Sequence, residues 1–181
     1  MAIDEIVRRH GFRSPREKFN GEIAEGEIDG ERVIALKPMT FMNNSGESVA
    51  PAARFYKIEP VDVIVIHDEL DLLDGKVRVK RGGGAAGHNG LRSIDAHLGS
   101  DYWRMRLGIG HPGRKDLVLH YVLQNFLPEE TIWLDKLLPA QAEALPLLLS
   151  GQDSAFMSKV ALLMDPPPAR NPAPRPATSE R

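Results

Sequence analysis

The chain of 181 residues is 42% hydrophobic and 27% charged, which is enough apolar material for one domain with its own core. Its net charge of -2 excludes a global polycation, so any nucleic acid must bind a local basic patch. The chain has no cysteine, which excludes disulfides, zinc–thiolate sites and cysteine nucleophiles, and makes a reducing cytoplasm the expected compartment.

The chain opens on a helix pattern. Apolar side chains over residues 3–10 share one helix face, and Gly11 is typical of the position after a helix end. Residues 13–18 are predicted to form a basic loop. No apolar run approaches the roughly 18 residues of a membrane helix, and no signal-peptide pattern is present, so we expect neither feature.

A β-hairpin is predicted next. Residues 20–28 and 31–36 alternate between apolar and polar side chains, as half-buried strands do. The dipeptide Asp29-Gly30 between them favours a tight two-residue turn.

A loop at residues 37–46 then leads into a predicted helix that ends near Lys57. Asn44 or Ser45 is the expected N-cap of this helix, with Glu47 in its first turn.

The most informative stretch begins at Val61–Ile66, which is β-branched apart from Asp62 and is typical of a strand buried on both faces of a parallel sheet. The run changes abruptly to His67-Asp68-Glu69. Ligands of open α/β sheets bind beyond the carboxyl ends of strands, so these charged residues are candidates for a site.

A loop almost without side chains follows a second predicted strand at residues 76–80. Its glycine-rich stretches, residues 82–84 and 87–90, run into a predicted helix from His88 to Leu98. Backbone N–H groups of such a loop can meet ligand oxygens. The loop lacks GxxxxGK[ST] spacing, and the GxGxxG match at residues 82–87 is weak on its own, so the sequence does not specify a nucleotide site.

The remaining chain is predicted to be helical apart from one strand at residues 105–109. Helices are expected at about 116–124, from Pro128 to Leu149 with kinks or breaks at Pro139 and Pro146, and at about 152–164. Residues 165–181 are Pro-rich and are expected to be disordered. The prediction is therefore one α/β domain, residues 1–164, with a tail.

Asp68 is the leading candidate for chemistry. A carboxylate at a strand end either caps a turn or pairs with a cation such as Arg78 or Arg81, or it orients a catalytic histidine and stabilises its charged form.

The sequence does not say which histidine such a carboxylate would serve. Three of the six histidines lie in helix patterns and are interpreted as structural or exposed: His10, His97 and His120. The other three lie in predicted loops and are the candidates: His67, His88 and His111. His67 directly precedes Asp68, so its side chain is expected to point the other way.

Two asparagines, Asn43 and Asn89, lie in loops that feed the same predicted sheet edge. Asparagine is common in turns for local reasons, but its amide also suits recognition of a peptide or ester carbonyl. Phe41, beside Asn43, is either a core residue or an exposed stacking surface for a base.

Seven basic residues either line one strip or form an ordinary solvated face: Lys80, Arg81, Arg92, Arg104, Arg106, Arg114 and Lys115. The sequence contains no GxSxG elbow, no HExxH and no cluster of metal ligands. If the protein is a hydrolase, a water molecule activated by a general base is the remaining route.

Three blocks, KPMTFMNNSGESV, HDELDLLDGKVRVKRGGGAAGHNGLRSI and RMRLGIGHPG, resemble the signature blocks of bacterial-type peptidyl-tRNA hydrolase. The resemblance implies hydrolysis of the ester between a peptide and the 3′ end of tRNA, without a metal or cofactor. It also implies a monomer with a single three-layer α/β/α domain, a mixed and mostly parallel sheet, and peptidyl-tRNA as partner through its acceptor stem.

The resemblance assigns roles to individual residues. Asp68 resembles the carboxylate that supports the catalytic histidine, and Asn43 and Asn89 resemble the asparagines that hold the peptide backbone and the aminoacyl end of the tRNA. Phe41 resembles a residue that contacts that end, and His88, in the same GHNG motif as Asn89, is expected beside the substrate.

Lys80 and one of Arg104 or Arg106 resemble the cations that hold tRNA phosphates.

The sequence departs from the family in one large respect, because the family's opening block should precede Met1. This block comprises a strand, a GNPG-type turn, a tyrosine and a TRHN segment with the base histidine. We expect either an in-frame upstream segment that encodes it or a truncated chain without its first strand. Loss of a positioned base costs about 10²–10⁴-fold in rate.

Two other functions remain open on the sequence alone. One is a non-catalytic RNA-binding relative of the same fold. The other is a small-molecule α/β protein whose glycine loop holds a phosphorylated ligand.

Overall fold

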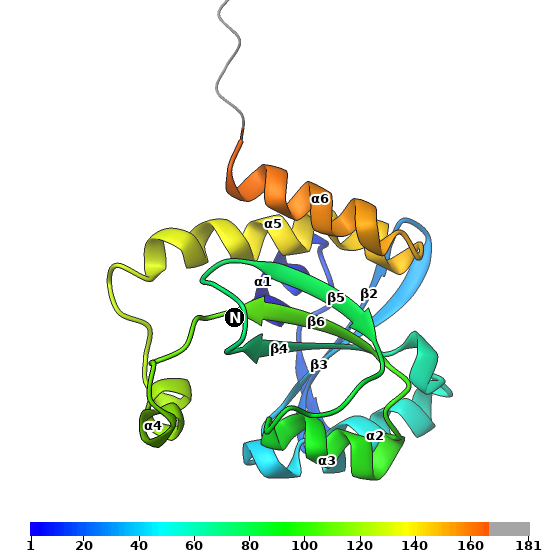
Figure 1. Ribbon diagram of the computed structural model, residues 1–181. Coiled ribbons are helices and arrows are strands. Elements are labelled where there is room, and N and C mark those ends of the chain that lie inside the picture. The colour runs from blue at the N-terminus through cyan, green and yellow to red at the C-terminus, as the bar shows by residue number, and fades with distance from the viewer. Residues whose placement is uncertain (167–181) are drawn as a thin grey trace, which may run out of the picture.

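The computed structural model describes residues 1–166 and has an α/β architecture (Figure 1). The strands are β1 Arg16–Lys18, β2 Gly21–Ile28, β3 Glu31–Pro38, β4 Ile64–Glu69, β5 Val77–Arg81 and β6 Trp103–Gly108. The α-helices are α1 Ala2–Arg9, α2 Gly46–Tyr56, α3 Asn89–Leu98, α4 Val118–Leu123, α5 Thr131–Leu149 and α6 Asp153–Met164. Three short 3₁₀ helices are η1 Met42–Asn44, η2 Pro60–Asp62 and η3 Lys115–Leu117.

Helices cover the strands on both sides. In Figure 1, α5 and α6 lie on one side of the strands and α2 and α3 on the other, which makes three layers. The predicted α/β class is confirmed. The Pro-rich tail was predicted from Asp165, and its residues 167–181 lie outside the described part of the chain.

The strands form two three-stranded sheets, ordered β1-β2-β3 and β4-β6-β5. Of the four strand pairs in residues 1–166, β4–β6 is parallel and the other three are antiparallel. The sheets thus differ from the single, mostly parallel sheet expected from the resemblance. Both β3 and β4 lie at an edge of their sheets, so β4 has a strand neighbour on one side only among residues 1–166.

The predicted hairpin is confirmed as β2 and β3. Its turn has positive φ at both central residues, 50° at Asp29 and 84° at Gly30, as a two-residue turn with the twist of the strands requires. The predicted basic loop is corrected, because Arg16–Lys18 pairs with β2 as the short strand β1.

Two further boundaries differ from the expectation. The strand predicted from Val61 begins at Ile64, because Val61 belongs to the 3₁₀ helix that Pro60 starts, and it extends to Glu69. Ser45 occupies the N-cap position of α2, but its hydroxyl donates to the Met42 carbonyl and accepts no helix N–H.

Helix α5 is continuous through Pro139 and Pro146, so the predicted kinks or breaks do not interrupt it. Proline has no N–H, and Pro146 therefore leaves the Ala142 carbonyl without its helical donor. The His10 ring supplies the missing bond, because its Nε2 lies 2.8 Å from that carbonyl oxygen. His10 is structural, as interpreted from the sequence.

The main core lies between the sheets and helices α1, α5 and α6, with Met105, Leu137 and Phe156 almost fully buried. A smaller cluster consists of Leu91 and Ile94 from α3 together with Tyr102. Over residues 1–166, none of the helices combines the length and the apolar character needed to cross a membrane.

Candidate functional site

The candidate site is centred on Asp68, near the carboxyl end of β4. The Oδ1 atom of Asp68 lies 3.1 Å from Nε2 of His88, which is the N-cap residue of α3. The structure thus selects His88 from the three candidate histidines as the one whose ring contacts this carboxylate. Within residues 1–166, Oδ2 of Asp68 has no side-chain hydrogen bond, and the side chain is 35% exposed.

The hydrogen bonds of His88 define its tautomer. Its Nδ1 accepts from the backbone N–H groups of Gly90, at 3.1 Å, and Leu91, at 3.3 Å. This nitrogen therefore carries the lone pair, and Nε2 carries the proton that is donated to Asp68. His88 caps the helix with one nitrogen and holds the carboxylate with the other.

His67 also holds Asp68, through a hydrogen bond to the Asp68 backbone. Its Nδ1–H donates to the Asp68 carbonyl oxygen at 2.7 Å, and its ring meets that of His88 edge-on at 5.1 Å between centroids. Burial lowers the pKa of His67, which keeps the ring neutral. The sequence did not predict that His67 holds the Asp68 backbone, because neighbouring residues do not show which acceptor a buried imidazole will find.

The surroundings of Asp68 affect its own ionisation in opposite directions. Burial raises the pKa of the carboxyl, while the hydrogen bond from His88 lowers it. The net effect is a pKa below the usual value, so Asp68 is ionised at neutral pH.

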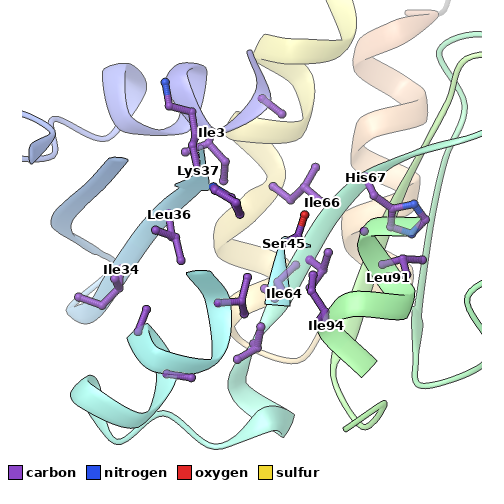
Figure 2. A pocket seen from close by; sticks show the side chains of 18 of the residues that line it. Ile3, Ile34, Leu36, Lys37, Ser45, Ile64, Ile66, His67, Leu91 and Ile94 are labelled. Atoms are coloured by element: carbon purple, nitrogen blue, oxygen red, sulfur yellow. The ribbon is translucent and has the colours of Figure 1, made fainter. Parts of the chain in front are cut away.

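A cavity of about 480 Å³ extends along β4 and reaches Asp68 and His88 at one end. Figure 2 shows its apolar lining, with Ile34 and Leu36 from β3, Ile64 and Ile66 from β4, and side chains from α3 across from them. His67 lies at the same end as Leu91 in this view.

Phe41, Asn43 and Asn89 lie outside the lining of this cavity, although they are close to it in the fold. Asn89 is the first residue of α3, next to His88, and Asn43 belongs to η1, which packs against α3. All three side chains are exposed, Phe41 by 84%. Phe41 and Asn43 thus flank the lining residue Met42, Asn89 lies between the lining residues His88 and Gly90, and the roles of all three remain predictions.

The basic residues of β5 and β6 divide into exposed and buried. Lys80 is exposed, and Arg106 is partly exposed and pairs with Glu69 at 2.8 Å. Arg104 is only 1% exposed and donates to the carbonyls of Gly83 and Gly84, both at 2.6 Å. A buried guanidinium cannot reach a phosphate, so Arg106 is the better candidate of the two arginines.

Two of the other histidines have local partners. His97 contacts the Ser93 carbonyl within α3, and Nδ1 of the exposed His111 accepts from the Gly113 N–H in a turn. In the part of the chain that the structure describes, no group of three or more His, Asp or Glu side chains is arranged to hold a metal ion.

Comparison with known proteins gives a consistent family. The model of the family described as peptidyl-tRNA hydrolase matches residues 1–167. The peptidyl-tRNA hydrolase of Parvibaculum lavamentivorans is 57% identical over 173 residues, 95% of this chain and 84% of that protein. The protein of the same name from Gluconobacter oxydans is 59% identical over 164 residues, 90% of this chain and 87% of its own.

A solved structure agrees with the sequences. The crystal structure of peptidyl-tRNA hydrolase from Acinetobacter baumannii is 38% identical to this chain, with a TM-score of 0.82. The match covers 88% of this chain and 82% of that one. With its fold, its three sequence blocks and the carboxylate at the end of β4, the chain belongs to the peptidyl-tRNA hydrolase family.

Proposed function

We propose that this chain hydrolyses the ester that joins a peptide to the 3′-terminal ribose of tRNA. Water attacks the ester carbonyl, the bond from the carbonyl carbon to the ribose oxygen breaks, and a proton passes to that oxygen. The products are a peptide carboxylate and tRNA with a free ribose hydroxyl. The observation that carries the proposal is Asp68 in the cavity lining, where His88 holds its Oδ1 and no side chain within residues 1–166 bonds its Oδ2.

In this proposal Asp68 supports the imidazolium that forms when a histidine deprotonates the attacking water. His88 does not have that role, because its Nδ1 lone pair is used by the amides of Gly90 and Leu91. His88 instead orients Asp68 by bonding Oδ1, which leaves Oδ2 without a side-chain partner in residues 1–166. By resemblance, the base histidine belongs to the family's opening block.

Substrate contacts are proposed for residues next to the cavity lining in the chain and for two cations of β5 and β6. The amides of Asn43 and Asn89 can pair with the peptide backbone and the aminoacyl end, since each carries both a donor and an acceptor. The ring of Phe41 is free to stack on a terminal base. Lys80 and Arg106 would contact phosphates of the acceptor stem. We also propose that the protein acts as a cytoplasmic monomer.

The test is release of free tRNA from an N-acetylaminoacyl-tRNA. It is measured for the 181-residue chain and for the same chain extended by the codons in frame upstream. We expect the extended chain to release tRNA catalytically and its Asp68→Asn variant to bind the substrate without releasing it. Binding of tRNA by the extended chain with no ester cleavage would contradict the proposal and favour the RNA-binding relative.

A further inference from the structure

An exposed aromatic ring with a cation over it lies at the C-terminal end of α2. The Phe55 side chain is 58% exposed, and the Lys18 ammonium lies 3.6 Å from the centre of its ring. In Figure 1, the chain runs from α2 to the start of β4, and Asp68 lies near the other end of that strand. The six residues of β4 span about 20 Å, so Phe55 lies far from the candidate site.

Three rings form this surface, which we call the aromatic patch: Phe19, Phe55 and Tyr56. The ring centroids of Phe19 and Phe55 are 5.4 Å apart, and those of Phe55 and Tyr56 are 5.0 Å apart. Phe19 comes from the turn between β1 and β2, so the patch joins a hairpin to a helix end. Tilted and edge-on arrangements are the favourable ones for aromatic pairs, so the rings hold one another in place.

The backbone at Phe19 is unusual. Phe19 and Asn20 have φ of 56° and 51°, in the left-handed region where a bulky side chain is rarely found. Two-residue hairpin turns need positive φ at both positions and favour Asn-Gly, so phenylalanine fits this turn poorly. Strained residues of this kind cluster at ligand-binding sites. Here the strained turn places Lys18 and Phe19 beside Phe55.

The charge that the aromatic patch presents to solvent is positive. Within residues 1–166, the hydrogen bonds and cation–π contacts of its rings involve three cations, Arg16, Lys18 and Arg32, and one carboxylate, Glu25. The two arginine side chains are 50% and 68% exposed, whereas that of Glu25 is only 16% exposed. Successive side chains of a strand point to opposite faces, so Glu17 lies on the other face of β1. A polyanion therefore meets cations here, although the whole chain has a net charge of -2.

Exposed rings among cations suit single-stranded nucleic acid, because bases stack on the rings while phosphates pair with the cations. Lys18 already covers one face of Phe55, so the two interactions compete. A cation over an exposed ring is worth a factor of about 2–5 in an equilibrium constant, whereas a stacked base is worth about 5–160. A base can therefore displace the Lys18 ammonium, which is then free to pair with a phosphate.

We propose that the aromatic patch is a second RNA-binding site, which takes a single-stranded segment. One base stacks on Phe55, and phosphates on either side of it pair with Lys18 and with Arg16 or Arg32. Duplex RNA does not suit the patch, because its bases are stacked on one another and none is free for a ring. The inference does not depend on the proposed ester hydrolysis, which concerns the other end of β4.

The test is a titration of the 181-residue chain with the single strand octauridylate, followed by backbone amide chemical shifts. We expect the largest shifts at residues 16–20 and 54–57. Shifts confined to residues 41–43 and 88–90 would overturn the proposal, since the RNA would then bind only beside Asp68. Asp68→Asn should show the same shifts as the unaltered chain, so failure of the patch and failure of the hydrolase proposal are distinguishable.

Two other ligands separate base stacking from charge. A fully paired RNA duplex of G and C has no free bases, and hexaglutamate has no bases at all. Both should shift the amides of residues 16–20 much less than octauridylate does. Equal shifts with hexaglutamate would contradict the proposal, because the patch would then recognise an acidic protein segment by charge alone.

Matched variants locate the binding, with affinity read from the amides of residues 16–20. Phe55→Ala should weaken octauridylate binding by about tenfold or more. Leu162→Ala removes another apolar side chain, 55% exposed on α6, and should leave the affinity unchanged. If Phe55→Ala folds and binds as tightly as the unaltered chain, no base stacks on this ring and the proposal is wrong. If it does not fold, the shifts of the unaltered chain still decide the question.

The salt dependence tests the phosphate contact. Lys18→Ala should lower the slope of log affinity against log salt by about 0.7, the value for one phosphate of a single strand. Lys136→Ala removes an exposed lysine of α5 and should leave the slope unchanged. Equal slopes for the two variants would refute the assigned pairing of Lys18 with RNA.

Discussion

His88 donates its Nε2–H to Oδ1 of Asp68 across 3.1 Å while its other ring nitrogen caps α3. One side chain therefore links the end of a strand to the start of a helix. The orientation of the Asp68 carboxylate depends on the integrity of that helix end, and the predictions for both residues follow from this connection.

Replacing Asp68 with asparagine should reduce ester cleavage by about 10²–10⁴-fold in the extended chain, because a neutral amide cannot stabilise a charged imidazole. Binding of tRNA should change little. Turnover of N-acetylaminoacyl-tRNA and gel-shift affinity separate the two effects. Asp71→Asn, an exposed carboxylate three residues along, is the control and should leave both unchanged. Equal turnover by the two variants would refute the assigned role.

Replacing His88 with alanine removes the helix cap as well as the contact with Asp68. A lost N-cap costs about 1 kcal/mol, so we expect a lower free energy of unfolding by urea denaturation. Asparagine is a good N-cap residue, and His88→Asn should therefore recover most of that stability. Turnover should stay low in both variants, since neither side chain reproduces the imidazole donor to Asp68. Recovery of turnover along with stability would mean that only the cap matters.

The two arginines of β6 should behave differently. Arg106→Gln should weaken tRNA binding and lower the slope of log affinity against log salt by about 0.9, the value for one phosphate contact on a duplex. Arg104→Met should instead lower the free energy of unfolding by about 3 kcal/mol or more, because it removes a buried cation with three hydrogen bonds. Arg78→Met, an exposed position on the neighbouring strand, is the stability control.

Stability should depend on pH through Glu25, which accepts hydrogen bonds from Arg16, Tyr56 and Arg32. These bonds lower the pKa of Glu25 to about 2 in the folded protein, against 4.5 for the free side chain. Because the folded pKa is depressed, the stabilisation is full above pH 4.5 and is lost as pH falls toward 2. Urea unfolding between pH 6 and pH 2 should show a weaker pH dependence for Glu25→Gln. The exposed Glu31→Gln should match the unaltered chain.

The His10 ring should stabilise α5 at its proline. His10→Ala leaves the Ala142 carbonyl without a donor, and an unsatisfied buried acceptor costs about 1–3 kcal/mol. We expect a matching loss in the free energy of unfolding by urea. If the double variant His10→Ala, Pro146→Ala restores the stability, the loss arises from the missing helical bond. No recovery would assign it to packing of the ring.

Features encoded by neighbouring residues were predictable from the sequence. The Asp29-Gly30 hairpin, the helix after the glycine loop and the position of Asp68 at a strand end all follow from local propensity and periodicity. Tertiary partners decide the rest. The burial of Arg104 depends on the carbonyls of a distant loop, and β1 exists only because β2 offers it an edge.

The candidate site shows the same division. The motif marked Asp68 and His88 separately, but the bond between them depends on how α3 packs against the end of β4, twenty residues away in sequence. The continuity of α5 was missed for a similar reason. A proline predicts a break unless another side chain fills the vacant hydrogen bond, and His10 lies 132 residues from Ala142.

The arginine beneath the glycine loop has a consequence for recognition. Gly83 and Gly84 have no side chains that could hold them in place. The buried Arg104 side chain nevertheless donates hydrogen bonds to both of their carbonyls. Ordering of this segment is therefore completed during folding, and a molecule that docks on it encounters a rigid surface. Association there should proceed with a small entropic penalty, unlike capture by a loose glycine segment.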